Sequence, residues 1–129
     1  MASVLKVDSI TGVTTAGSIS VTGEGNSTTT NLQQGLAKVW ADFQGNSTAT
    51  LHDSFNVSSL DDDGTGDYSL NFTNAMNNGN FCCTMMSSNN DRRNNADNTS
   101  TELHIGTFDI NGSAEDSNRV YGSATGDLA

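Results

Sequence analysis

The chain has 129 residues, of which 33% are hydrophobic and 6% aromatic, and its net charge is −10 at pH 7. Binding to nucleic acid or to an anionic membrane surface needs clustered basic residues, so 5 Lys and Arg against 15 Asp and Glu argue against both partners. No stretch approaches the roughly 18 consecutive apolar residues of a membrane-spanning helix. Because large apolar side chains are few, we expect the chain to complete its core by assembling with copies of itself.

Residues 1–34 are predicted to form an extended N-terminal arm. Short apolar runs at residues 4–7 and 19–22 are strand candidates, and Thr and Gly dominate between them. The arm holds too few apolar residues to fold alone, so we expect it to become ordered by pairing with another protein; the alternative is a disordered terminus. The residues assigned to this attachment are Val4, Leu5, Lys6 and Val7.

Alternation of apolar and polar residues predicts a β-strand at residues 36–43. Every second side chain there is small or apolar, as expected for the inner face of a half-buried strand. These residues are Ala37, Val39, Ala41 and Phe43. Leu36 and Trp40 lie on the opposite face, and we predict that they contribute to a subunit interface. The alternative places Trp40 in the core of a single subunit.

Residues 54–60 and 67–73 alternate in the same way, and the second segment places Tyr68, Leu70 and Phe72 on one face. The segment between them contains Asp-Asp-Asp-Gly-Thr-Gly, which is rich in turn formers, so the sequence predicts a β-hairpin. The carboxylates do not have the spacing of a helix-flanked calcium loop. We therefore interpret them as a solvated turn.

The remaining strands are predicted at residues 81–86, 102–110 and 119–124, with a polar loop at residues 87–100. About six strands with regular turn signals indicate an all-β fold, a small antiparallel sandwich or barrel over residues 35–129. The residues predicted to form an exposed contact loop are Asn90, Asp91, Arg92, Arg93 and Asn94.

The sequence contains no recognisable catalytic, cofactor or metal motif. His52 and His104 lack the His-x-His or Glu-x-x-His spacing of a metal site. Cys82 and Cys83 are neighbours whose side chains point to opposite faces of a strand, so we expect both to stay reduced. A glycosidase-type carboxylate pair would be set by the fold and not by spacing. We predict a non-enzymatic protein without cofactor or bound metal.

Four segments resemble a module of tail-fibre-like and other structural proteins of marine bacteriophages. In this chain they read Gly-Leu-Ala-Lys-Val-Trp-Ala-Asp-Phe-Gln-Gly, Ser-Phe-Asn-Val-Ser-Ser-Leu, Asp-Gly-Thr-Gly-Asp-Tyr and Asn-Phe-Thr-Asn-Ala-Met. They occupy residues 35–45, 54–60, 63–68 and 71–76. Residues 3–10 also resemble the way such proteins begin. Related modules usually carry Pro where this chain has Asn77, and small aliphatic residues where it has Cys82 and Cys83.

The resemblance implies a non-enzymatic component of the virus particle, with a homotrimer as the expected assembly. One hypothesis is a tail-fibre or other appendage module that contacts a host glycan or receptor, or neighbouring virion proteins. The other is a capsid decoration protein of the head-fibre or cement type, or a tail connector, anchored by its N-terminal arm through strand addition. Because residues 1–7 lack the apolar segment of a secretion signal, assembly is expected in the cytoplasm of the host bacterium.

Overall fold

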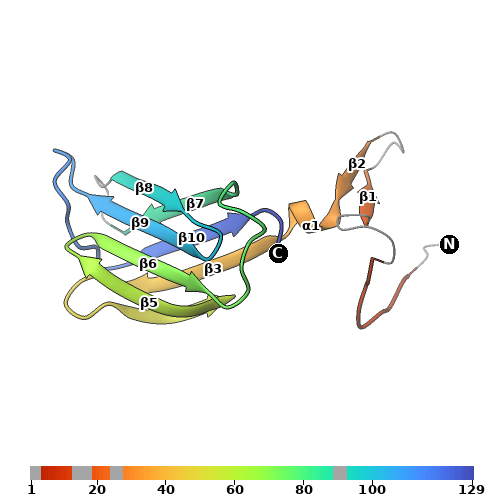
Figure 1. Ribbon diagram of the computed structural model, residues 1–129, viewed down its shortest axis with the longest axis horizontal. Helices are drawn as coiled ribbons and strands as arrows, with labels where there is room; N and C mark the ends of the chain where they lie inside the picture. The colour runs from red at the N-terminus through yellow and green to blue at the C-terminus, as the bar shows by residue number, and fades with distance from the viewer. Residues whose placement is uncertain (1–3, 13–18, 24–27, 89–92) are drawn as a thin grey trace. The chain divides into compact units, whose positions relative to one another are not determined.

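The computed structural model describes residues 4–12, 19–23, 28–88 and 93–129 (Figure 1). The chain divides into two compact units, Met1–Gly35 and Leu36–Ala129. In the described part of the chain, no helix has the length and apolar character needed to cross a membrane.

The first unit contains a small hairpin followed by one helical turn. Strand β1 (Ser20–Thr22) pairs in antiparallel fashion with β2 (Thr29–Asn31), and α1 (Leu32–Gly35) comes next. Residues 4–12 form neither helix nor strand, and the residues assigned to attachment are all exposed there: Val4, Leu5, Lys6 and Val7. Their attachment to another protein stays a prediction.

The second unit is a sandwich of two four-stranded antiparallel sheets (Figure 1). The β3 sheet has the order β4-β3-β10-β7 and consists of β3 (Ala37–Gln44), β4 (Thr50–Phe55), β7 (Cys82–Ser87) and β10 (Val120–Thr125). The β6 sheet has the order β5-β6-β9-β8 and consists of β5 (Val57–Gly64), β6 (Asp67–Phe72), β8 (Arg93–Asn98) and β9 (Glu102–Phe108). The predicted all-β fold is confirmed, and of the two architectures considered it is the sandwich.

The core lies between the inner faces of the two sheets, as the period-two alternation of side chains requires. Phe43 of β3 meets Tyr68 of β6 edge to face, with ring centroids 5.3 Å apart. The other buried apolar residues are Val39, Ala41, Leu70, Phe72, Met76, Leu103, Ile105, Val120 and Ala124. Full burial of each large side chain stabilises the fold by about 1.5–3 kcal/mol.

The predicted β5–β6 hairpin is present, but its strands extend further than expected. Residues 61–63, interpreted as a turn, belong to β5, and the turn itself consists of Thr65 and Gly66. Residues 54–60 do not form one strand, because Asn56 adopts a left-handed conformation with φ of 60° and separates β4 from β5. Asn tolerates this conformation better than most residues with a side chain.

Two strands of the sandwich, β4 and β8, were not predicted, and both are edge strands. The predicted polar loop at residues 87–100 is wrong over β8, which pairs with β9 from Arg93 opposite Phe108 to Asn98 opposite Leu103. Of the predicted contact loop, Arg93 and Asn94 begin this strand, whereas Asn90, Asp91 and Arg92 lie outside the described residues. An edge strand is held by backbone hydrogen bonds to one neighbour, so a polar sequence can form it.

The chain enters and leaves the sandwich at the same end. Ala37, at the start of β3, pairs with Thr125, at the end of β10. The last residue is also fixed there, since the Ala129 backbone nitrogen donates a hydrogen bond to the Ala75 carbonyl at 3.0 Å. The opposite end, which we call the distal end, carries the connections at residues 45–49, 65–66 and 109–119.

A buried tyrosine ties the connections of the distal end together. The Tyr68 hydroxyl donates to the Gly45 carbonyl at 3.0 Å and to Asp116 Oδ1 at 3.1 Å. The same Asp116 oxygen accepts a hydrogen bond from the Gly66 backbone nitrogen at 2.6 Å. Burial and the neighbouring Asp116 carboxylate raise the pKa of Tyr68 to about 12. Tyr68 and Asp116 together thus link three connections that are far apart in the sequence.

Candidate functional site

The outer face of the β3 sheet carries one large exposed apolar side chain from each of its four strands. Phe55, Trp40, Tyr121 and Met86 come from β4, β3, β10 and β7, with exposed fractions of 53%, 37%, 40% and 63%. Trp40 lies opposite Phe55, and Tyr121 lies opposite Met86. Trp40 and Tyr121 alternate with core residues of their strands and point away from the core, and Phe55 and Met86 lie beside them on the same face. We call this surface the aromatic face.

An open groove of about 480 Å³ runs across the aromatic face between β3, β10 and β7. Trp40, Tyr121 and Met86 form its apolar walls. Two small polar residues, Thr84 and Ser123, lie on its floor within an otherwise largely apolar lining; they are opposite each other in the register, with their hydroxyl oxygens 3.1 Å apart. The groove therefore combines aromatic walls with hydroxyl groups that can donate and accept hydrogen bonds.

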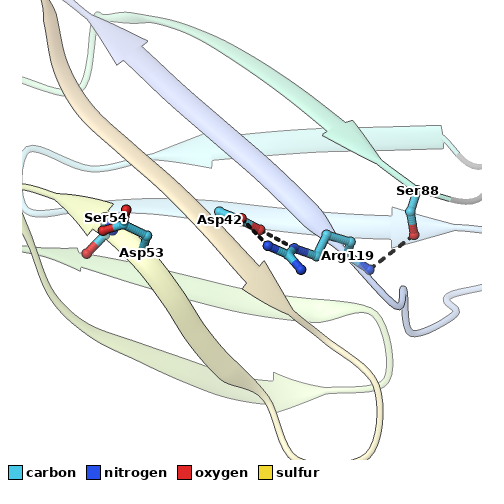
Figure 2. Close-up of polar contacts among 5 residues, drawn as sticks. All are labelled: Asp42, Asp53, Ser54, Ser88 and Arg119. Atoms are coloured by element: carbon cyan, nitrogen blue, oxygen red, sulfur yellow. Dashed lines mark hydrogen bonds and ion pairs between the residues drawn. The ribbon is translucent and has the colours of Figure 1, made fainter.

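An ion pair borders the groove. Arg119, just before β10, donates from Nε and Nη2 to the two carboxylate oxygens of Asp42 on β3 (Figure 2). The Arg119 side chain is 41% exposed and that of Asp42 23%. The hydrogen bonds from Arg119, followed by its charge, lower the pKa of Asp42, and the carboxylate in turn raises the pKa of Arg119. The pair is bidentate, so the Asp42 carboxylate is held in one orientation beside the groove.

Neighbouring strands hold the ion pair in position. The Arg119 backbone nitrogen donates to Ser88 Oγ at 3.1 Å (Figure 2), and the Ser88 nitrogen donates to the Arg119 carbonyl at 2.9 Å. Asp53 of β4 lies opposite Asp42 in the register and accepts a hydrogen bond from the Ser54 nitrogen at 2.8 Å. The charged groups beside the groove are therefore fixed by contacts within the β3 sheet and its connections.

The outer face of the β6 sheet has a different character, because five carboxylates gather on it. We call it the acidic face; its ionisable residues are Asp61, Asp63, Asp67, Asp97, Glu102 and His104. Such a dense set of like charges favours contact with water over contact with another acidic protein. The two outer faces of the sandwich are therefore chemically unlike.

On the acidic face, Asp63, Asp67 and His104 come close enough together that each could offer a ligand atom to one metal ion. The candidate ligand atoms lie within 4.8 Å of one another. They already have protein partners: His104 Nε2 lies 2.5 Å from Asp67 Oδ1, and Asp63 Oδ2 accepts a hydrogen bond from Ser69 Oγ at 2.6 Å. Sequence reasoning singled out the carboxylates near the β5–β6 turn but not their approach to His104, because β9 supplies the histidine and β5 and β6 the two carboxylates.

The predicted subunit-interface residues both lie outside the core. Trp40 belongs to the aromatic face, so the structure does not place it in the core of a single subunit. Leu36 precedes β3 and is exposed. Their role in a contact between subunits stays a prediction. Cys82 is exposed and Cys83 partly buried, and they lie on opposite sides of β7.

Sequence reasoning missed most of the groove. Tyr121 and Met86 were predicted to lie in strands, but their shared face with Trp40 depends on β10 pairing with both β3 and β7. Asp42 and Arg119 are 77 residues apart in the chain. The one available signal was the mixed character of the Trp40 face, which is unusual for a strand whose outer side faces only water.

Comparisons with known proteins identify no relative. No family model matches the chain, and no match is found among curated proteins or solved structures. The chemistry of the two faces is therefore the main basis for assigning a function.

Proposed function

We propose that this protein is a non-enzymatic structural component of a bacteriophage particle, an appendage-type module that makes its contacts through the aromatic face. The observation that carries this proposal is the contrast between the aromatic face and the acidic face of the same sandwich. Exposed aromatic and Met side chains beside an Arg are enriched at interaction surfaces. The resemblance of residues 35–76 to a phage structural module supports the place in a virus particle.

The ionisation of the groove supports a binding role over a catalytic one. Asp42 is the groove's carboxylate, and its pKa is lowered by Arg119. A carboxylate held ionised in this way cannot donate a proton near neutral pH, and its low basicity makes it a weak proton acceptor. The pair is better suited to orienting a bound partner than to acid–base chemistry.

The N-terminal arm supports attachment to another component of the particle. Its residues 4–12, which form neither helix nor strand, expose Val4, Leu5, Val7 and Ile10. An extended apolar segment of this kind can add to the edge of a partner's sheet. Several copies held together, as in the expected homotrimer, would multiply weak contacts made by each aromatic face.

The test is to locate the protein on the particle and then remove the arm. Mass spectrometry of purified particles should detect the chain, and its copy number relative to the major capsid protein should separate an appendage from a capsid decoration. Deletion of residues 2–34 should abolish incorporation while the sandwich stays folded, as judged by circular dichroism. Absence of the full chain from the particle would refute the proposed function. Normal incorporation of the truncated chain would refute anchoring by the arm.

A further inference from the structure

We propose that the groove on the aromatic face binds neutral carbohydrate, with a pyranose ring lying against Trp40 and Tyr121. This proposal rests on the proposed function and deepens it by naming the ligand class of the aromatic face. It depends on three properties of the groove: the chemistry of its walls and floor, the fixed ion pair beside it, and its size.

The walls and the floor of the groove match the two kinds of surface on a sugar ring. A pyranose presents C–H groups on its faces and hydroxyl groups around its rim. Trp40 and Tyr121 offer aromatic surface to the C–H groups, and Thr84 and Ser123 offer hydroxyls to the rim. A purely apolar ligand would cover these hydroxyls without giving them new hydrogen bonds, which is unfavourable.

The ion pair adds directional hydrogen bonding without net charge. Asp42, which lines the groove, can accept a charge-assisted hydrogen bond from a sugar hydroxyl, and Arg119 holds its carboxylate in place. Arg119 neutralises Asp42, and the remaining carboxylate beside the groove, Asp53, repels an anionic ligand. The chain as a whole carries −10, so an acidic sugar would be repelled as it approached. Both observations favour a neutral glycan.

The size of the groove favours a small ligand over a second copy of the chain. Its volume of about 480 Å³ falls within the range of small-molecule sites, about 300–1,000 Å³. The four apolar side chains of the face are each about half exposed, which amounts to roughly 400 Å² of side-chain surface. A stable protein–protein interface buries about 800 Å² on each partner, of which roughly 57% is apolar. The apolar area of the face therefore suits either occupant, and it is the volume of the groove that favours a small ligand.

Trp40 is the only tryptophan of the chain, so its fluorescence reports directly on the groove. We would titrate the full-length protein with cellohexaose, maltohexaose and the hexamer of N-acetylglucosamine, and expect a saturable change of emission with at least one of them. Tyr121→Ala keeps the reporter and should weaken binding by roughly tenfold, which corresponds to about 1.4 kcal/mol. Ile110→Ala, an exposed apolar residue outside the groove lining, is the matched control and should bind normally.

Two results would overturn the assignment. The first is a flat titration with all three sugars at millimolar concentration while the protein is folded by circular dichroism. The second is Trp40 emission that changes with protein concentration, together with a Trp40→Ser variant that sediments as a monomer where the parent protein is an oligomer. In that case a second copy covers the face. Neither result bears on the presence of the protein in the particle, so failure of the glycan proposal and failure of the proposed function remain distinguishable.

Discussion

Replacing Gly66 by alanine tests how tightly the β5–β6 turn is held against the rest of the sandwich. Gly66 has φ of 66°, and a Cβ atom at this position would lie 2.4 Å from the Thr107 carbonyl oxygen and 2.7 Å from the Glu115 nitrogen. Both are backbone atoms that are already hydrogen-bonded, since the Glu115 nitrogen donates to the Thr107 carbonyl at 3.0 Å. Neither can move aside without weakening this connection.

Two penalties therefore add at this position. The left-handed conformation costs an alanine about 1–2 kcal/mol. The collision with backbone atoms is a case of overpacking, for which about 1–3 kcal/mol is typical. Gly112→Ala is the matched control, because Gly112 also has a positive φ of 88° but a Cβ there meets nothing within 4 Å. We expect Gly66→Ala to be more destabilising than Gly112→Ala by about 1–3 kcal/mol, the size of the collision alone.

Urea unfolding followed by circular dichroism gives the free energy of unfolding for both variants by linear extrapolation. A single cooperative transition with an unchanged slope would show that only stability has changed. If both variants lowered the free energy of unfolding by the same amount, the turn would be free to move away from Thr107 and Glu115. The close approach would then not be a fixed feature of the fold.

Two further variants test buried and surface polar contacts. Tyr68→Phe removes the hydroxyl that donates to Asp116 and to the Gly45 carbonyl, so we expect the free energy of unfolding in urea at pH 7 to fall by about 1–2 kcal/mol. Tyr121→Phe, on the exposed aromatic face, should change this free energy little. Because the pKa of Tyr68 is raised to about 12 in the folded protein, its contribution to stability is complete below pH 10 and declines as the pH rises towards 12. If the difference in stability between Tyr68→Phe and the parent stayed constant between pH 10 and pH 12, the burial argument would be contradicted. Arg119→Gln removes the partner that lowers the pKa of Asp42, so the variant should unfold at lower urea concentration than the parent at pH 7. This difference in unfolding midpoint should shrink as the pH falls below the usual carboxyl range, because Asp42 then becomes protonated. An equal difference in unfolding midpoint at pH 7 and pH 3 would show that the loss of stability does not come from the Asp42–Arg119 ion pair.

The parts of the fold that could be predicted are the strands whose two faces meet different surroundings. In β3 and β6, core residues such as Val39 and Leu70 alternate with side chains of the outer face, and this alternation is visible in the sequence. The edge strands β4 and β8 carry no such signal. Their place in the fold comes from backbone pairing with one neighbour, to which side-chain polarity contributes little.

The groove could not be predicted because it depends on which strands are neighbours. Trp40 and Tyr121 share a face only because β10 pairs with β3, although the two strands are separated by most of the sandwich in sequence. A single sequence contains the alternation of each strand but not the order of strands in a sheet. The same reason explains why the approach of His104 to Asp67 was not foreseen.

The pairing of Ala37 with Thr125 has a consequence for how this sandwich can be combined with other proteins. A domain whose first and last strands end side by side can be spliced into a surface loop of another polypeptide with little disturbance to either partner. Its distal end then projects away from the splice point. Such a geometry allows the same domain to be inserted into many different proteins and to project from each of them.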